Sequence, residues 1–428
     1  MRLLYSFVYF IGFFLATPYW LVRGLFNPQY LSNLKSRLFG PAKLLPALDG
    51  KTRVWVWALS LGEVLAAREL VAELEKDGHE VFVTATTLAG LAMAKANWPK
   101  LVVLPSPLDF SFSISRFLET TKPDHLVLVE TDLWPGVLMA AQKKGLSTAL
   151  VSARLSPRSF KNYRKIRFFW AKVLQYFDKI ITQTQEDQDK FIALGANPEK
   201  VAVGGNLKFD QTLPPEDLHE ARGQVLAQTG WPKARYLVAG SFHAGEDEMI
   251  LKIFLELNPN FPDARLILAP RDRRAFAQTY RLAQEYFPDK VARRAEPKSE
   301  DQNALVFILD TLGELENFYS LAEIALIGKS WPGRHEGGGH NPLEAAARRR
   351  PVICGPKIHN FKWIYAALVA AGGALVIDQK NLAAKLTALL NDPGLLTKMG
   401  ETGQKFVVEH QGAVRATLDI LALKKGLS

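Results

Sequence analysis

The stretch Gly337-Gly-Gly-His-Asn-Pro-Leu-Glu344, with the apolar run Glu323-Ile-Ala-Leu-Ile-Gly328 before it, decides the fold class. The apolar run predicts a short buried strand, and Pro342 suits the first turn of a helix. Gly338 and Gly339 let backbone amides approach a ligand. Strand, glycine-rich loop and helix together predict an α/β fold with a phosphate site for a nucleotide-linked ligand. An ordinary strand-to-helix turn with a helix cap is the alternative, because short glycine motifs are common.

The composition is that of a globular protein with two domains. The chain has 428 residues, of which 48% are hydrophobic and 22% charged. A single core stops growing below this length, so two domains of about 150 to 200 residues are expected. The net charge of +10 favours an anionic partner, which could be nucleic acid, acidic lipid or a phosphorylated sugar. The one cysteine, Cys354, excludes an internal disulfide and a multi-cysteine metal site.

Residues 3 to 22 form an uncharged, aromatic-rich run of 20 residues. This length would cross a hydrocarbon layer as a helix, or the run could lie on the membrane surface. A cleaved signal peptide is the alternative, although only a weak Ala16-Thr-Pro18 follows in place of a cleavage site. We therefore expect residues 1–25 to be a membrane anchor. The positive-inside rule then places the rest of the chain at the cytoplasmic face of the inner membrane, because basic residues gather after the run: Arg23, Lys35, Arg37, Lys43, Lys51 and Arg53.

Two series of alternating strands and helices follow. The expected strands are 54–59, 80–85, 101–104, 125–129, 147–152 and 179–183 in the first series, and 236–240, 264–269, 304–309, 323–327 and 351–354 in the second. Each series predicts a parallel sheet with crossover helices. A polar stretch with paired prolines, residues 206–215, separates them. We expect Rossmann-like domains at 26–210 and 211–428 that face a cleft, with the last helix able to pack back on the first domain.

The spacing of the motifs argues against three kinds of site: a dinucleotide site, a P-loop and a zinc site. No G-x-G-x-x-G follows the first strand, where the loop reads Ser60-Leu-Gly-Glu63, so a dinucleotide fingerprint is missing. Gly328-Lys-Ser330 ends like a P-loop, but position 323 is Glu323 and not glycine. His335, Glu336 and His340 resemble a zinc helix only superficially, because the second histidine is one residue late.

Glu63 has two interpretations. With Ser60 it has the spacing of a capping box, in which the glutamate side chain reaches back to the start of its helix. It also follows the first strand, where a carboxylate could take a proton from an attacking hydroxyl. The residues alone leave both interpretations open.

Seven segments occur in the order found in one enzyme family. They are Ser60-Leu-Gly-Glu-Val64, Glu130-Thr-Asp-Leu-Trp-Pro135, Ser152-Ala-Arg-Leu-Ser156, Gly205-Asn-Leu-Lys-Phe-Asp210, Gly240-Ser-Phe-His-Ala-Gly-Glu246, Asp310-Thr-Leu-Gly-Glu-Leu315 and Gly338-Gly-His-Asn-Pro-Leu-Glu344. Along nearly its whole length the chain resembles the 3-deoxy-D-manno-octulosonic acid (Kdo) transferases of lipopolysaccharide synthesis. The apolar N-terminal run is similar as well.

The resemblance implies a GT-B fold and an inverting transfer of Kdo from CMP-Kdo to a lipid A precursor, with no cofactor and no metal. It implies that Glu63 is the general base and that Glu130 is a second active-site carboxylate; a helix-start acid is the alternative for Glu130. The residues expected to bind the donor are Ser241, His243, Pro270, Arg271, Gly313, Gly338, Gly339, Asn341 and Glu344. Asn341 and Glu344 would share a helix face and take ribose hydroxyls, and amides near Ser241 and His243 would hold the phosphate. Arg154, Arg158 and Lys208 would supply positive charge in the cleft and contact the acceptor.

The segment 154–179 is both basic and aromatic. It holds eight basic residues against one acid, Asp178, and its aromatic residues are Tyr163, Phe168, Phe169 and Trp170. This combination suits an anionic glycolipid at a membrane, and the apolar N-terminal run favours lipid over nucleic acid. An RNA site or a solvated helix face are the alternatives.

The loop 329–336 departs from the family pattern. It is longer than usual and has Lys329 where glycine is typical, while Asp272 stands where histidine is common and Trp57 replaces a familiar histidine. The rival functions are another GT-B glycosyltransferase, a sugar-nucleotide epimerase of the same shape and a membrane-tethered binding protein.

Overall fold

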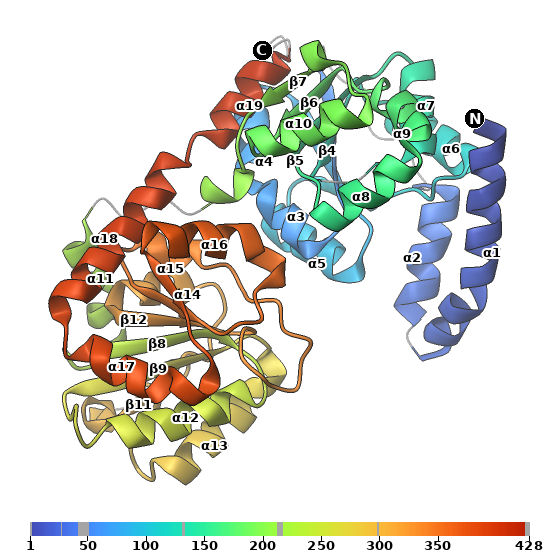
Figure 1. Cartoon of the computed structure of the whole chain (residues 1–428). Helices are drawn as coiled ribbons and strands as arrows, with labels where there is room; N and C mark the ends of the chain where they lie inside the picture. The colour runs from blue at the N-terminus through green and yellow to red at the C-terminus, as the bar shows by residue number, and fades with distance from the viewer. Residues whose placement is uncertain are drawn as a thin grey trace. The chain divides into compact units, whose positions relative to one another are not determined.

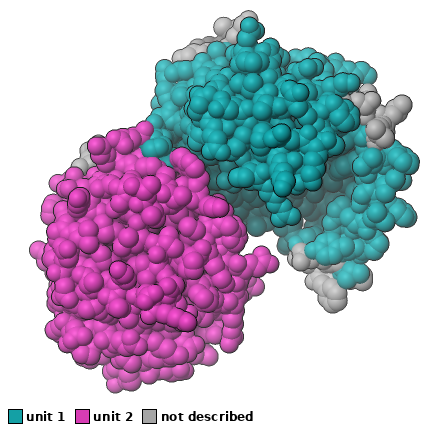
Figure 2. All heavy atoms as spheres, in the orientation of Figure 1, with its two compact units in different colours: residues 1–211, 410–428 teal, residues 212–409 magenta. Residues whose placement is uncertain are grey.

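The computed structural model describes residues 2–26, 28–41, 51–130, 133–211, 217–297 and 299–423. The chain divides into two compact units, which Figure 2 shows in different colours. Unit 1 comprises Met1–Gln211 and His410–Ser428, and unit 2 comprises Thr212–Glu409. The prolines of the expected linker fall at 212–216, outside the described residues.

Unit 1 contains a parallel seven-stranded sheet in the order β3-β2-β1-β4-β5-β6-β7. Its strands are β1 (Arg53–Ala58), β2 (Glu80–Ala85), β3 (Val102–Pro105), β4 (His125–Val129), β5 (Ser147–Ala153), β6 (Lys179–Thr182) and β7 (Val201–Val203). Side chains alternate across β1, so that Val54 and Val56 pack on one face while Trp55 and Trp57 pack on the other. Both faces are buried, which explains why this strand is apolar throughout.

Helices cover both faces of this sheet (Figure 1). One face packs against α3 (Leu61–Ala66), α4 (Arg68–Lys76), α5 (Leu88–Asn97) and α19 (Ala413–Leu421). The other packs against α6 (Ser111–Thr121), α7 (Pro135–Lys143), α9 (Arg167–Leu174) and α10 (Gln185–Leu194), with α8 (Pro157–Lys165) beside α9 and α10. The C-terminal helix α19 belongs to this unit because Ala413 and Val414 are buried in its core.

The N-terminal run forms a helix that packs on the rest of unit 1. Helix α1 (Arg2–Phe26) lies beside α2 (Pro28–Phe39), as Figure 1 shows. The Tyr5 hydroxyl donates a hydrogen bond to Asp109, and the Tyr9 hydroxyl accepts one from the Asp109 backbone N–H at 3.1 Å. Asp109 in turn accepts bonds from Gly136 and Val137 at the start of α7. None of the helices in the described residues combines the length and apolar character needed to cross a bilayer.

Unit 2 contains a second parallel seven-stranded sheet, in the order β10-β11-β9-β8-β12-β13-β14. Its strands are β8 (Arg235–Phe242), β9 (Ala264–Pro270), β10 (Val291–Arg293), β11 (Val306–Ile308), β12 (Ala322–Ile327), β13 (Val352–Cys354) and β14 (Ala374–Val376). Its helices are α11 (Leu218–Thr229), α12 (Glu246–Leu257), α13 (Phe276–Tyr286), α14 (Leu315–Phe318), α15 (Leu343–Ala347), α16 (Lys362–Ala371), α17 (Leu382–Leu390) and α18 (Pro393–Glu409). Helices α12, α13 and α17 bury apolar side chains against one face of the sheet.

The structure confirms the expected α/β class with two parallel sheets. Each expected strand is present to within a few residues, and the described residues add β7, β10 and β14. These three strands are three residues long and lie at sheet edges, so they carry no periodicity that a sequence pattern could reveal.

Candidate active site

The strand order of unit 1 puts two glutamates at one edge of its sheet. The sheet order reverses between β1 and β4, and ligands of such sheets bind beyond the carboxyl ends of the strands at that point. Glu63 lies in the first turn of α3, just after β1, and Glu130 directly follows β4. Glu130 has a φ of 65°, a left-handed conformation that costs free energy in a residue other than glycine and is common at functional sites.

The Glu63 carboxylate is both a helix cap and a perturbed acid. It accepts hydrogen bonds from the backbone N–H groups of Leu59 and of Ser60, the latter at 3.0 Å, so the capping interpretation is confirmed. Burial first, and then the negative charge of Glu130, raise the pKa of Glu63 to about 7, against the two backbone bonds and Lys208, which lower it. A carboxylate with this pKa exchanges a proton readily at neutral pH, which is the property of a general base.

Glu130 is held in the ionised form. Its side chain is buried, forms an ion pair with Lys208, and lies 3.3 Å from the Arg154 guanidinium. Burial works to raise the pKa of Glu130, but the charges of Lys208 and Arg154 outweigh it and lower the pKa. Lys208 lies in a short 3-10 helix, Leu207–Phe209. We call Glu63, Glu130, Arg154 and Lys208 the carboxylate cluster; two neighbouring acids with pKa values pushed apart are typical of catalytic sites.

The helix-start alternative for Glu130 is wrong, because α7 begins at Pro135 and the partners of Glu130 are cations. Arg158 lies exposed on α8, and among the described residues it makes no ion pair with the carboxylate cluster. Residues 131 and 132 of this segment lie outside the described part of the chain.

Unit 2 repeats the arrangement at the reversal between β8 and β12. Ser241 lies at the end of β8 and Lys329 follows β12, with φ values of 57° and 61°. His243 follows β8, Pro270 ends β9, and Arg271 comes next, where its backbone N–H donates to Phe242 at 3.0 Å. Three adjacent strands thus deliver polar side chains to one edge of the sheet.

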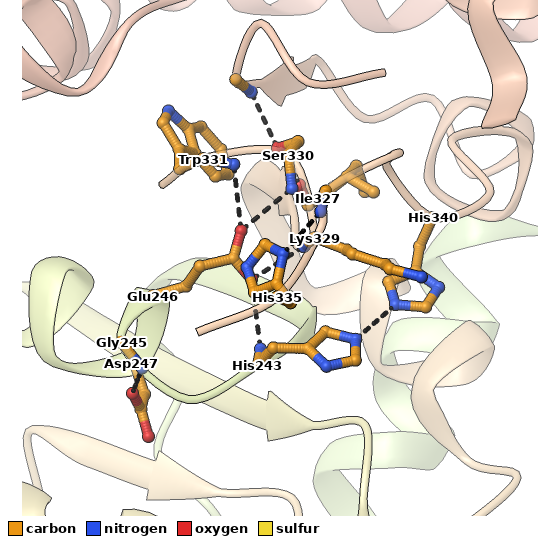
Figure 3. Close-up of polar contacts among 12 residues, drawn as sticks. His243, Gly245, Glu246, Asp247, Ile327, Lys329, Ser330, Trp331, His335 and His340 are labelled. Atoms are coloured by element: carbon orange, nitrogen blue, oxygen red, sulfur yellow. Dashed lines mark hydrogen bonds and ion pairs between the residues drawn. The ribbon is translucent and has the colours of Figure 1, made fainter. Parts of the chain in front are cut away.

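Glu246 fixes the loops of this edge, as Figure 3 shows. Its buried carboxylate accepts backbone hydrogen bonds from His243 at 3.1 Å, Lys329 at 2.8 Å, Ser330 at 2.9 Å and Trp331 at 3.0 Å. The His335 Nε2 atom lies 3.4 Å from the same carboxylate. One side chain therefore ties the turn after β8 to the unusual loop after β12.

The expectation that backbone amides face a ligand here is wrong for most of them. The N–H groups of Gly338, Gly339 and His340 donate to backbone carbonyls of residues 357, 329 and 328. The amide of His243 is occupied by Glu246, and those of Gly245 and Glu248 by Asp247. Helix α12 also begins only at Glu246, so Ser241 and His243 precede it. The positive φ angles of Gly338 and Gly339, 119° and 71°, therefore allow the hydrogen bonds that pair this loop with its neighbours.

Three imidazoles gather at this edge. His243 Nε2 lies 2.9 Å from His340 Nε2, and the His335 ring centroid is 5.2 Å from that of His243. Arg271 and Lys329 are close enough to act electrostatically on both rings of the bonded pair. We call His243, His335, His340, Arg271 and Lys329 the cationic cluster.

Asn341 and Glu344 lie near each other, but not as one face of a helix. Helix α15 begins at Leu343, and Asn341 precedes it and accepts the Leu343 N–H at 3.1 Å. Burial first, and then the charge of Glu316, raise the pKa of Glu344 to about 7, while a hydrogen bond with Asn341 lowers it. The pair presents a carboxyl group and an amide, which could bind hydroxyl groups.

Gly313 is exposed, with a φ of 86°, in a loop held by Glu314 through bonds from Thr311 and Arg294. No three His, Cys, Asp or Glu side chains form a group suited to a metal ion within the described ranges.

Sequence reasoning missed the roles of Glu246 and His335. Glu246 stood in a quoted segment, and an acid in the first turn of a helix is an ordinary dipole partner, so nothing in the sequence indicated its contacts with a loop some 80 residues later. The sequence around His335 shows only the approximate spacing of a zinc ligand, and nothing in it indicates the contact with Glu246.

Comparisons with known proteins agree with the geometry. Residues 32–211 match the family model described as 3-Deoxy-D-manno-octulosonic-acid transferase (kdotransferase), and residues 288–406 match Glycosyl transferases group 1. A 3-deoxy-D-manno-octulosonic acid transferase of Haemophilus influenzae is 32% identical over 404 residues, which covers 92% of each chain.

Solved structures share the fold at low identity. A UDP-GlcNAc 2-epimerase from Neisseria meningitidis superposes with a TM-score of 0.59 at 15% identity, over 87% of this chain and 100% of that one. MurG from Acinetobacter baumannii has a TM-score of 0.56 at 14% identity, with the same coverage. These likenesses support a GT-B-like fold and nothing finer. From the sequence match along its length, the chain belongs to the 3-deoxy-D-manno-octulosonic acid transferase family and is a glycosyltransferase.

Proposed function

We propose that this enzyme transfers Kdo from CMP-Kdo to a lipid A precursor with inversion, and that Glu63 is the general base. Family membership supports the sugar that is transferred. The observation that carries the proposal is the carboxylate cluster: Glu63, with a pKa raised to about 7, beside the ionised Glu130. An acid and a carboxylate in distinct protonation states at neutral pH suit proton abstraction from a sugar alcohol.

The acceptor hydroxyl gives its proton to Glu63 as its oxygen bonds to the anomeric carbon of Kdo. The bond from that carbon to the CMP phosphate breaks, and its electron pair leaves on the phosphate. Attack and departure on opposite faces of the carbon invert its configuration. Glu130 keeps Lys208 and Arg154 in place, so their positive charge lies beside the acceptor site.

On the donor side, the cationic cluster would stabilise the departing phosphate. Because most of the amides of both turns are occupied within the chain, the donors would be the side chains of Ser241, Arg271, Lys329 and the histidines. Asn341 and Glu344 would bind ribose hydroxyls. The acceptor would thus bind unit 1 and the donor unit 2. The reaction would need no metal ion, because Arg271 and Lys329 supply the positive charge that stabilises the phosphate.

We also propose that α1 lies on the membrane surface as an anchor, at the cytoplasmic face. The helix packs on unit 1 through Tyr5 and Tyr9, while Phe14 and Leu15 are 68% and 73% exposed. More exposed apolar side chains lie on the same helix and on α9: Phe7, Val8, Phe10, Phe168. The Tyr5 ring stacks on Phe169 of α9 with centroids 6.2 Å apart, which joins the two apolar surfaces. Apolar groups flanked by the basic residues of α8 and α9 suit an anionic membrane.

Two experiments test these proposals. Binding of CMP should compete with CMP-Kdo, whereas UDP and GDP should not; a preference for UDP or GDP would instead favour another GT-B glycosyltransferase. An epimerase would convert its donor with no acceptor present.

For the membrane, Phe14→Ser with Leu15→Ser should reduce cosedimentation with vesicles containing phosphatidylglycerol. The matched control is Leu255→Ser with Val408→Ser, which removes apolar side chains of 46% and 50% exposure from unit 2. Equal loss in both variants would contradict the proposed surface.

A further inference from the structure

The bonded imidazoles of His243 and His340 form a rigid pair. Their planes are within 3° of parallel, their centroids are 5.2 Å apart, and their Nε2 atoms are joined at 2.9 Å. The His243 backbone is fixed by Glu246, and the His340 carbonyl accepts the Tyr365 hydroxyl at 2.8 Å. Both rings are therefore positioned from outside the pair, as Figure 3 shows for His243.

The Nε2 to Nε2 bond limits how many protons the pair can hold. In a bond between two neutral rings, one Nε2 carries a hydrogen and the other accepts it. The donor ring then has a bare Nδ1, and the acceptor ring has an Nδ1–H, so the pair offers one outward donor and one outward acceptor. One added proton at the bare Nδ1 gives two outward N–H donors and keeps the central bond. A second added proton would put hydrogens on both Nε2 atoms and break it.

The surroundings of the pair are cationic. Burial first, and then the charges of His335, Lys329 and Arg271, lower the pKa of His243 to about 4. Burial and the same charges, with Arg271 first among them, lower the pKa of His340 to about 3. Three acids lie nearby. Asp272, which pairs with Arg274 at 2.6 Å, acts to raise the pKa of His243 but is outweighed by burial and the cations. The buried Glu344 interacts electrostatically with Arg271, and Glu246 accepts four backbone bonds. Without a ligand the pair is neutral at pH 7.

The cations beside the pair, Arg271 and Lys329, could bind an anion. In the part of the chain that the structure describes, neither Arg271 nor Lys329 forms an ion pair with a carboxylate. The backbone amides of Arg271, Lys329 and His340 are occupied by other groups of the chain. A phosphoanion bound here would reverse the local charge and would accept from outward N–H groups, and the neutral pair offers only one of these.

We propose that the His243–His340 pair takes up one proton when a phosphoanion binds the cationic cluster, so that ligand binding and protonation are coupled. The inference rests on the proposed donor site and deepens it. Both histidines are uncharged above about pH 4 in the free protein, and the anion favours the charged form. Uptake therefore occurs between the free and the bound pKa of the pair, and across that range the affinity for the anion falls by up to about tenfold per pH unit as the pH rises.

Calorimetry of the full chain tests this with cytidine 5′-(methyl phosphate). This diester has no proton to exchange near neutrality, unlike CMP, whose second phosphate pKa is about 6. At pH 6.5, the binding enthalpy is measured in PIPES and in bis-Tris, which differ in ionisation enthalpy. The slope gives the protons taken up, expected to be between about 0.5 and 1 per ligand.

The variants His243→Asn and His340→Asn should bind with a slope near zero, and the matched control His219→Asn, an exposed histidine of the same unit, should keep the wild-type slope. A thermal melt of each variant confirms that it is folded. A zero slope for the wild type, or an unchanged slope in the two pair variants, overturns the inference while leaving the proposed donor intact. If the uridine ester binds with proton uptake and the cytidine ester does not bind, the coupling is supported but the proposed CMP-Kdo donor is wrong. No binding of either ester overturns both.

Discussion

Replacing Glu63 by glutamine removes the proposed base and keeps the helix cap. The amide oxygen of glutamine can still accept the Ser60 N–H that Glu63 accepts at 3.0 Å, so the first turn of α3 should survive. A positioned general base contributes about 10² to 10⁴ in rate, so kcat should fall by at least about 10²-fold. Binding of CMP should change less than about threefold, because no donor contact is removed.

The pH dependence gives the same claim a second test. With a pKa of about 7, half of Glu63 is ionised at pH 7 and about a tenth at pH 6, so kcat should fall about fivefold between them. Glu130 is the charge that raises this pKa after burial, so Glu130→Gln should move the acid limb of the profile to lower pH. Initial rates of CMP release between pH 5.5 and 8.5 measure both. Two results would refute the reasoning. One is a kcat of Glu63→Gln that stays within tenfold of the wild-type kcat. The other is an acid limb of the pH profile that does not move in Glu130→Gln.

Stability reports on the same carboxyl group. Its folded pKa of about 7 lies above the ordinary value of 4.5, so ionised Glu63 costs stability above pH 7 and costs none below pH 4.5. This rise in the pKa of Glu63 lowers the free energy of unfolding at high pH by at most about 3 kcal/mol, and by less because the carboxylate is partly in contact with solvent. Glu63→Gln should therefore unfold at a higher temperature than the wild type at pH 8 and at an equal one at pH 4.5. Equal midpoints at both pH values would show that the pKa is not raised.

Other substitutions test the packing around each cluster. Lys208→Met leaves the buried Glu130 with one cation, so the free energy of unfolding in urea should fall by about 3 kcal/mol, and by less in the double variant Lys208→Met with Glu130→Gln; an equal loss in both would show that the ion pair is not the cause. In unit 2, a Cβ at Gly240 would lie 1.9 Å from the Tyr319 hydroxyl, so Gly240→Ala should cost about 1 to 3 kcal/mol. Gly223→Ala, on helix α11 with open space around it, should instead stabilise by up to about 1 kcal/mol, and a loss there would contradict the packing argument.

Much of the fold could be predicted because buried parallel strands are apolar throughout. Val54 to Ala58 is buried on both faces, which produces a run that a sequence pattern detects. The three-residue edge strands escaped because they have neither length nor alternation. The C-terminal helix was expected as able to return to the first domain, and α19 is found in unit 1, where Ala413 and Val414 fill its core.

The sequence predicts where the site residues lie in the fold, but it does not predict which groups hydrogen-bond to one another there. Glu63 and Glu130 follow strands, and the sheet order brings such positions together. Hydrogen bonding between loops is different, because it joins residues far apart in sequence with no spacing rule. The amides of Gly338 and Gly339 were expected to face a ligand, yet they pair with residues 357 and 329. The role of Glu246 depends on the same contacts and could not be derived from its sequence neighbours.

The most direct measurement combines the substrates with one substitution. The purified chain is incubated at pH 8 with CMP-Kdo and a tetraacyl lipid A precursor, and the lipid is weighed by mass spectrometry beside a Glu63→Gln sample shown to bind CMP. We predict a lipid heavier by one or more Kdo residues with the wild type and at least about 10²-fold less of it with the variant. No added mass with the wild type, or equal product from both proteins, would contradict the account.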